Sequence, residues 1–303
     1  MRIRGNDAVN GRIAIIGFGE AGRTISAGWP VARRTLAAFD VKLASSETRE
    51  AMAARCREAD IAGYSLAADA LAGAATVFCL VTADQAVVAA RHASASVVPG
   101  TLWFDGNSCS PDSKRQAAAI VEAAGGRYVD MAIMAPVHPK KHRVPVLIAG
   151  PHAEAGLAVL TALDMNAAVA GMEVGQASAI KMLRSVMIKG LEALTAECIL
   201  AARRAGVEAQ VLASLQASDP GFDWQARSSY NLERMTAHGS RRAAEMEEVE
   251  KTVAALGLPP RMSVAIAAWQ QQIGALGLAF EDEDPAAGDH GLATRADAVL
   301  NRL

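Results

Sequence analysis

The chain contains 303 residues, of which 51% are hydrophobic and 20% are charged, and its formal net charge at pH 7 is −2. This composition indicates a globular protein with enough length for two domains, and it excludes a mostly disordered chain. A net charge so close to zero provides no broad positive field, so we expect neither nucleic acid nor a membrane surface as a partner.

The first half of the chain alternates short β-branched runs with Ala-rich amphipathic stretches, which is typical of repeated strand–helix units. Strands are predicted at residues 12–16, 35–39, 76–81, 101–104, 127–130 and 144–149. Helices are predicted at residues 21–28, 47–58, 84–92 and 113–124. Strands separated by helices favour a Rossmann-type α/β domain, with a doubly wound parallel sheet and right-handed crossovers.

From about Gly175 the β-branched runs disappear and helical periodicity takes over. Helices are predicted at residues 177–205, 210–215, 227–256 and 262–276. Gly206 and Gly257 are expected to cap two of these helices at their carboxyl ends, and the acidic tail from Glu281 onward is expected to be loose. The predicted division is an α/β domain over residues 1–172 and an all-helical domain over residues 173–303.

A glycine-rich turn joins the first predicted strand to the first predicted helix. Its spacing, Gly-x-Gly-x-x-Gly, allows a tight turn and a close approach of backbone to a pyrophosphate, whose charge the helix start stabilises. We therefore expect a dinucleotide to contact Gly17, Phe18, Gly19, Glu20, Ala21 and Gly22. Glycines that serve packing alone are the alternative interpretation.

An acidic residue, Asp40, closes the second predicted strand about twenty residues after the first glycine. Its carboxylate would accept hydrogen bonds from the adenosine ribose and repel a 2′-phosphate, which predicts NAD as the cofactor. Lys42 could weaken this preference, so NADP stays an option. Val81 and Thr82, at the carboxyl end of the third strand, are further expected cofactor contacts.

Two later segments indicate the chemistry. A polar loop, Asp105-Gly106-Asn107-Ser108-Cys109-Ser110-Pro111, follows the fourth predicted strand, and Lys181 lies in the first turns of the long helix after Gly175. The order of glycine loop, polar loop and lysine helix resembles the β-hydroxyacid dehydrogenase and 6-phosphogluconate dehydrogenase superfamily over nearly the whole chain. The resemblance implies that Asn107 and Ser108 lie beside nicotinamide and substrate, that Lys181 is the catalytic acid or base, and that the protein forms a homodimer. An ordinary polar turn before a capped helix is the alternative for the loop.

Helical geometry places Lys181, Ser185 and Lys189 on one stripe, with Arg184 close by. Oxidation of an alcohol needs a base, and a lysine with an ordinary pKa of ~10.4 must be desolvated or crowded by cations to serve as one. Arg184 and Lys189 could supply that crowding, or could bind an anionic group on a small-molecule substrate. Ser185 stands where the family carries asparagine. A solvated cationic helix face is the alternative.

The chain departs from the family at Met134-Ala135-Pro136, where the family carries Ser-Gly-Gly. Proline removes a donor and methionine adds apolar bulk, so we expect a larger or less polar substrate, with Met134 among its contacts. The basic run from His138 to Arg143 is interpreted as a solvated loop, with contact to an acidic substrate or a cofactor phosphate as the alternative.

In the helical half, His238, Arg241, Arg242 and Glu245 are spaced to share one broad helix surface. This pattern resembles a branch of the superfamily with a variant carboxyl-terminal domain, and His238 and Arg241 are candidate substrate contacts. An intrahelical salt-bridge network is the alternative.

The remaining signals exclude several classes of protein. No apolar run approaches the ~18 residues of a membrane span, and the first residues lack a signal-peptide core. The four cysteines form no CxxC pair, which predicts reduced thiols in a cytoplasmic protein, and no compact ligand set predicts a metal site. The leading hypothesis is an NAD(P)-dependent dehydrogenase acting on a CH–OH group. There are two alternatives. One is an imine reductase, although imine reductases usually lack the lysine, and the other is a non-catalytic dinucleotide-binding protein.

Overall fold

The computed structural model describes residues 11–280 and 291–303. The chain divides into two compact units, the first ending at Met182 and the second beginning at Leu183. The first unit therefore extends past the predicted division at residue 172. It does so because the start of the long helix packs on the sheet, where Ala177 is buried against Ala132 and Ala149.

The first unit is built on one eight-stranded sheet in the order β3-β2-β1-β4-β5-β6-β7-β8. Its strands are β1 (Arg12–Ile16), β2 (Leu36–Phe39), β3 (Ala62–Tyr64), β4 (Ala74–Cys79), β5 (Leu102–Asp105), β6 (Arg127–Ile133), β7 (Val146–Ala149) and β8 (Ala167–Gly171). All neighbours are parallel except β6 and β7, which pair antiparallel with Asp130 opposite Ala149. The predicted doubly wound parallel sheet is confirmed, with this one antiparallel pair as an exception. The connection over residues 134–145 contains only the short 3₁₀ turn η3 (Lys141–Arg143) and no helix of the kind that a parallel crossover usually carries.

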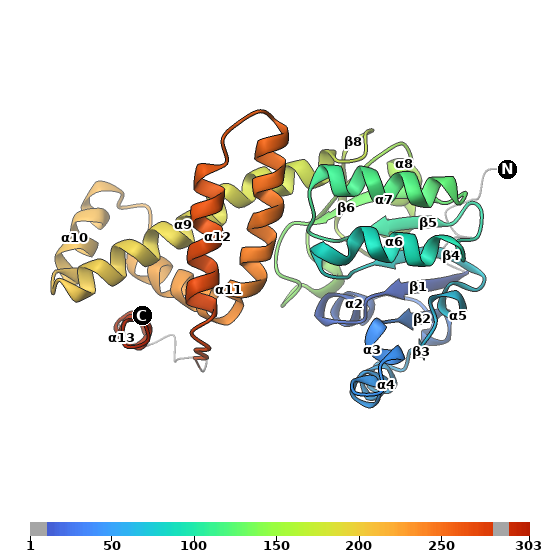
Figure 1. Ribbon diagram of the computed structural model, residues 1–303, viewed down its shortest axis with the longest axis horizontal. Coiled ribbons are helices and arrows are strands. Elements are labelled where there is room, and N and C mark those ends of the chain that lie inside the picture. The colour runs from blue at the N-terminus through green and yellow to red at the C-terminus, as the bar shows by residue number, and fades with distance from the viewer. Residues whose placement is uncertain (1–10, 281–290) are drawn as a thin grey trace. The chain divides into compact units, whose positions relative to one another are not determined.

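Helices cover both faces of this sheet. They are α2 (Glu20–Ser26), α3 (Val41–Ala44), α4 (Arg49–Glu58), α5 (Ala67–Leu71), α6 (Ala86–Ser94), α7 (Pro111–Ala123) and α8 (Ala153–Ala162), with 3₁₀ turns η1 (Arg33–Thr35) and η2 (Ala83–Gln85). Side chains alternate along each strand, so Ile13 and Ile15 join the core beneath α2, α4 and α8. Ala14 and Ile16 face the core beneath α5, α6 and α7, and Figure 1 shows α6 and α7 on the near face.

Two strands and three helices of this unit were missed by the sequence analysis, one of them being α3, which is only four residues long. β3 is three residues long and largely exposed at one edge, and β8 is an Ala- and Gly-rich strand at the other edge. Neither has the β-branched run that indicates a strand. The helices α5 and α8 are short and Ala-rich, with no strong capping signal at their starts.

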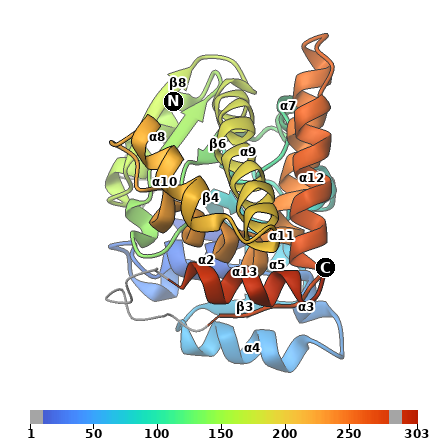
Figure 2. The same cartoon turned by 90° about the vertical axis from the view of Figure 1, so that its left-hand side faces the viewer.

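The second unit is helical, as predicted. The long helix α9 (Gln176–Arg204) begins in the first unit and is followed by α10 (Glu208–Ser218), α11 (Trp224–Ala255), α12 (Arg261–Gly274) and α13 (Leu292–Leu300). Figure 2 shows these helices from the side. Gly206 and Gly257 end α9 and α11 with positive φ values of 73° and 77°, which confirms both predicted caps.

Part of the tail that was expected to be loose is a helix. α13 buries Leu292, Ala296 and Val299 in the core of the second unit, so that expectation was wrong for residues 292–300. The preceding part of the predicted tail lies outside the described residues.

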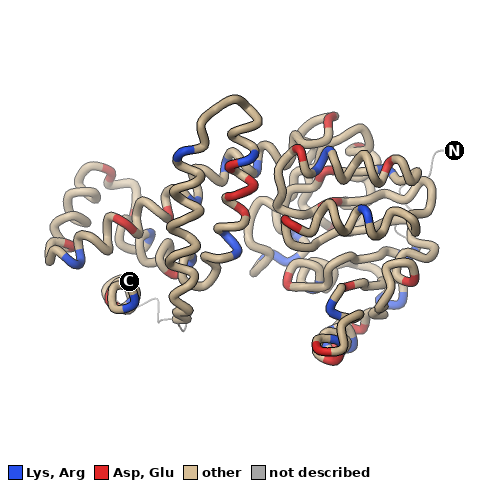
Figure 3. Tube along the Cα trace, viewed as in Figure 1, with Lys and Arg blue, Asp and Glu red and all other residues tan. Residues whose placement is uncertain are grey.

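Charged residues are spread over both units, and no disulfide joins the cysteines. Figure 3 shows basic and acidic residues interspersed over both units. All four cysteines are free thiols, and three of them are buried while Cys198 is exposed. Within residues 11–280 and 291–303, no helix combines the length and apolar character needed to cross a bilayer.

Candidate functional site

The glycine loop has the geometry of a turn that only small residues can form. Gly17 has a φ of 88°, and a Cβ there would lie 2.5 Å from the Leu80 carbonyl oxygen. A Cβ on Gly22 would overlap the Gly17 carbonyl, so the helix and the turn are in direct contact. At Gly19, by contrast, no atom lies within 4 Å of an added Cβ. The loop is therefore packed on its inner side and open where a phosphate would approach.

Asp40 connects this loop to the end of β2. One carboxylate oxygen accepts a hydrogen bond from the Phe18 backbone N–H at 2.8 Å, and the other accepts from the Lys42 N–H at 3.0 Å. Each carboxylate oxygen can accept a further bond, and the side chain is only partly buried. Asp40 therefore orders the loop and keeps acceptor capacity for ribose hydroxyls.

Asn107 links the carboxyl ends of β4 and β5. Its Oδ1 accepts from the Val81 N–H at 2.7 Å, and its Nδ2 donates to Asp105 Oδ1 at 2.7 Å. The residue is 2% exposed. These partners belong to the fold itself. The structural role of Asn107 is therefore to hold the ends of two strands together, beside the predicted cofactor contacts Val81 and Thr82.

The structure brings the predicted catalytic lysine to the polar loop. Lys181 Nζ donates to Ser108 Oγ at 2.6 Å, although the two residues are 73 positions apart. Ser108 follows β5, and Lys181 lies in the second turn of α9. The contact joins two of the predicted site residues within the first unit.

The start of α9 is held by a buried carboxylate. Asp130 Oδ2 accepts from the backbone N–H groups of Gly175 and Ser178, both at 3.1 Å, and from the Ser178 hydroxyl at 3.2 Å. The first N–H groups of a helix lack partners within the helix and carry partial positive charge, so a buried anion there is stabilised. Asp130 thus fixes the helix one turn before Lys181.

The loop between β6 and β7 packs on α2. His138 Nε2 lies 3.2 Å from Thr24 Oγ1, and a Cβ on Gly28 would overlap the His142 ring. His142 and Arg143 also contact Asp164. The run is exposed at every position except His142, which is partly buried, so it is a solvent-exposed loop of which three side chains also contact the fold. Met134, in the same connection, is partly buried, and its N–H donates to the Pro145 carbonyl.

The second unit holds the remaining predicted residues. Ser185 is buried with Lys189 Nζ 3.4 Å from its hydroxyl, whereas Arg184 is exposed. Lys189 forms an ion pair with Glu245 at 2.8 Å, so its charge is compensated there.

The predicted shared surface on α11 is divided by burial. Arg242 is buried in an ion pair with Glu192 on α9, while Arg241 is exposed and His238 partly exposed. The ion pairs Lys189–Glu245 and Arg242–Glu192 each join α9 to α11. They are therefore contacts between helices, whereas the alternative interpretation was a network within one helix.

The comparisons with known proteins give the family. Residues 12–179 match the NAD binding domain of 6-phosphogluconate dehydrogenase. The chain belongs to this family. Residues 202–273 match a domain of unknown function, DUF1932. The predicted superfamily, with its variant carboxyl-terminal domain, and the predicted nicotinamide dinucleotide are thereby confirmed.

Solved structures extend the comparison. A conserved hypothetical protein from Sinorhizobium meliloti 1021 is 36% identical, with 97% of each chain covered and a TM-score of 0.73. A 3-hydroxyisobutyrate dehydrogenase from Mycobacterium tuberculosis is 17% identical over 95% of this chain and 99% of its own, with a TM-score of 0.70. A reductive aminase from Aspergillus terreus is 16% identical over 95% and 98%, with a TM-score of 0.53. The last two likenesses show the fold, which is that of hydroxyacid dehydrogenases.

The glycine loop fits the nicotinamide dinucleotide of this NAD-binding family. The open space at Gly19 and the partly exposed carboxylate of Asp40 lie at the carboxyl ends of β1 and β2, which are parallel neighbours. These are the positions at which a doubly wound sheet binds pyrophosphate and ribose.

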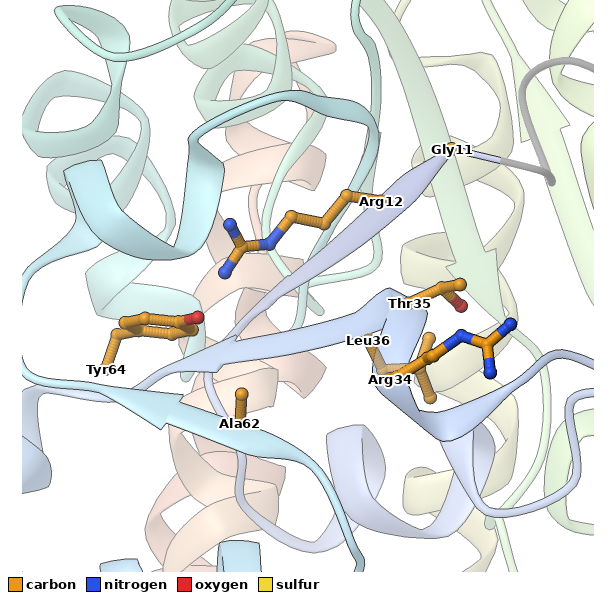
Figure 4. Close-up of a pocket in the computed structure, with 7 residues that line it drawn as sticks. All are labelled: Gly11, Arg12, Arg34, Thr35, Leu36, Ala62 and Tyr64. Carbon is orange, nitrogen blue, oxygen red and sulfur yellow. The ribbon is translucent and has the colours of Figure 1, made fainter.

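One pocket of this NAD-binding domain lies at the opposite, amino-terminal side of the first strands. Figure 4 shows its lining, and its volume is about 350 Å³. The lining residues are Gly11, Arg12, Arg34, Thr35, Leu36, Ala62 and Tyr64. The Arg12 guanidinium stacks 4.9 Å from the Tyr64 ring centroid and donates to the Ala72 carbonyl. The pocket is therefore separate from the strand ends that carry the predicted site.

Sequence analysis missed a buried lysine beside the predicted site. Lys114, on α7, is fully buried with the carboxylates of Asp105 and Asp130. Burial alone would lower its pKa, but Asp105, Cys109 and Asp130 raise the pKa above its usual value, so the ammonium stays charged. Burial and the neighbouring Asp105 likewise raise the pKa of Tyr128, whose hydroxyl donates to Asp105 at 2.6 Å. The available signal was a lysine on the otherwise apolar face of an amphipathic helix.

Proposed function

We propose that this protein is an NAD-dependent dehydrogenase that oxidises the CH–OH group of a hydroxy acid or related alcohol, or reduces the matching carbonyl. The observation that carries this proposal is the 2.6 Å hydrogen bond between Lys181 and Ser108. Both residues belong to the unit that carries the glycine loop, and Ser108 follows the carboxyl end of β5, on the same edge of the sheet. That edge is where ligands of doubly wound sheets bind.

The proposed chemistry assigns a proton transfer to Lys181. A bound nicotinamide dinucleotide supplies the hydride acceptor. Neutral Lys181 accepts the proton of the substrate hydroxyl during oxidation, and its ammonium returns a proton to the carbonyl oxygen in the reverse direction. Ser108 holds the Lys181 amine in place and offers a hydroxyl to the substrate oxygen. Without this acid–base partner the reaction would create an unstabilised alkoxide.

The proposed cofactor preference is for NAD. The carboxylate of Asp40 is fixed by two backbone N–H groups at the end of β2, so it cannot swing away from a 2′-phosphate without losing both bonds. The glycine loop residues Gly17 to Gly22 would hold the pyrophosphate. Asn107, Val81 and Thr82 would form the floor under the nicotinamide side of the site.

We also propose roles in substrate binding for the other residues that were predicted from the sequence. Met134, Arg184 and Ser185 are proposed substrate contacts, and His238 and Arg241 are proposed to act from the helical unit, with a second copy of the chain as the proposed partner. Reduction of a C=N bond is the second candidate, because a reductive aminase has this fold. Lys181 favours alcohol chemistry, which needs an acid–base group of this kind.

The decisive variant is Lys181→Ala, measured with NAD and a panel of hydroxy acids, sugar acids and aryl-substituted alcohols. We expect turnover to fall by about 100- to 10,000-fold, while NAD affinity stays within about threefold of the wild type. Lys251→Gln is the matched control, because Lys251 is an exposed lysine paired with Glu248 in the helical unit. Turnover that survives in Lys181→Ala would contradict the assigned role.

A further inference from the structure

The ammonium of Lys114 is completely enclosed, and every one of its donors is used. Lys114 Nζ donates to the Asp105 carbonyl at 2.5 Å, to Asp105 Oδ1 at 3.0 Å and to the Met131 carbonyl at 3.3 Å. Asp130 Oδ1 lies 3.5 Å away as a second ion-pair partner. An ammonium has three N–H groups, so this site saturates it.

One side of this cluster leads to Ser108. Asp105 Oδ1 accepts from Lys114, from the Asn107 N–H at 3.0 Å and from the Asn107 amide. Asn107 Oδ1 in turn accepts from the Val81 N–H, so the residue immediately before Ser108 is held through its backbone N–H and through both ends of its side-chain amide. Lys114 therefore stabilises the conformation of the loop that presents the Ser108 hydroxyl.

The other side leads to Lys181. Asp130 Oδ2 accepts from Gly175 and Ser178 at the start of α9, while Oδ1 lies 3.5 Å from the Lys114 ammonium and is attracted to it by charge without a hydrogen bond. Ser178 precedes Lys181 by one helical turn. A shift of Asp130 would therefore move the turn from which the Lys181 side chain extends.

A buried ion pair is weak support for stability by itself. Apolar residues of similar volume often serve as well, because burial of both charges costs much of the attraction between them. The neighbouring core positions of α7, Ala117, Ala118 and Val121, are apolar. A lysine at this place therefore calls for a reason beyond packing.

We propose that Lys114 is a positioning residue that sets the contact between Lys181 and Ser108. With one ammonium it fixes the loop through Asp105 and the helix start through Asp130, so the two halves of the proposed catalytic pair are held in register. The inference rests on the function proposed above, and it names the residue on which the geometry of that site depends.

The test is Lys114→Gln in the full-length protein, with hydrogen exchange by mass spectrometry as the first measurement. We expect amide exchange in residues 174–182 to accelerate by about tenfold or more, because the Gly175 and Ser178 N–H groups lose a fixed acceptor. Exchange in α12 should change by less than about twofold, which separates local release from general loss of stability. Lys251→Gln should resemble the wild type in both segments.

Kinetics provide the second measurement. We expect kcat to fall by about tenfold or more, with KM and NAD affinity within about threefold, because the substrate still binds but the acid–base pair is misaligned. Should Lys114→Gln fail to fold, the double variant Lys114→Gln with Asp105→Asn, which removes one charge of each sign, is measured in the same way.

Wild-type exchange in residues 174–182 of the folded variant overturns the proposal, and so does faster exchange with an unchanged kcat. The exchange measurement needs no substrate. It is therefore independent of the proposed dehydrogenase activity, whose own failure would appear as turnover that survives Lys181→Ala.

Discussion

The carboxylate of Asp40 accepts one N–H from the glycine loop and one from the first turn of α3. A carboxylate held in this way keeps its negative charge at a fixed place, at the end of β2. The amide of asparagine has one oxygen in place of two and no charge. Substitution by asparagine therefore removes the charge and leaves an acceptor for only one of the two N–H groups.

We predict that Asp40→Asn lowers the ratio of NAD to NADP affinity by about tenfold, because loss of the charge removes about 1.4 kcal/mol or more of discrimination against the 2′-phosphate. Calorimetric titration with each dinucleotide measures the ratio. Asp69→Asn, on the short helix α5, is the control and should leave it unchanged. An unaltered ratio in Asp40→Asn would show that the charge does not select the cofactor.

At the scale of elements, α11 and α12 of the helical unit pack backbone against backbone. A Cβ on Gly239 would overlap the Gln270 carbonyl, and Gly274 lies directly opposite, so the two backbones touch. Around this crossing, Glu192 on α9 binds both Arg242 on α11 and Gln270 on α12. The three helices are therefore joined by one buried carboxylate and by one contact between glycines.

We predict that Gly239→Ala destabilises the helical unit by about 1–3 kcal/mol, because the methyl group must push the two helices apart. Urea unfolding followed by circular dichroism measures the loss. Gly221→Ala is the matched control, since the nearest atom to its Cβ is 3.8 Å away, and its free energy of unfolding should stay within about 0.5 kcal/mol. Equal stability of the two variants would contradict the close contact.

At the scale of the whole molecule, the sheet brings the functional segments together by placing the carboxyl ends of parallel strands at one edge. The glycine loop follows β1, Asp40 follows β2, and the polar loop follows β5. Any ligand that binds only the folded edge must stabilise the folded chain, by an amount that its concentration and dissociation constant determine.

We predict that NAD at about 100 times its dissociation constant adds about 2.7 kcal/mol to the free energy of unfolding of the unit that binds it. Thermal unfolding at increasing NAD concentrations measures this as a rising midpoint. Gly19→Ala is the informative variant, because nothing lies within 4 Å of its added Cβ and the residue has a negative φ. It should unfold like the wild type without NAD and lose the NAD-dependent rise. A full rise in this variant would exclude the outer side of the loop as the pyrophosphate site.

Local patterns in the sequence were sufficient for the Rossmann-type fold, the glycine loop and the family. Alternating strands and helices, the spacing of Gly17, Gly19 and Gly22, and the two helix caps depend on neighbours within a few residues, and such signals survive in a linear sequence. The assignments of individual site residues, Lys181 first among them, stay predictions. The contact of Lys181 with Ser108 gives that assignment a geometry.

Only the tertiary structure decided the direction of β7, the burial of α13 and the cluster around Lys114. Lys114, Asp105 and Asp130 belong to a helix and two strands that become neighbours when the sheet forms. Likewise, the cap of α9 is a carboxylate more than forty residues earlier in the chain. Local sequence determined which elements form, because hydrogen bonding and periodicity act over a few residues. The positions of buried charges were decided by packing, since their partners come together only in the folded chain.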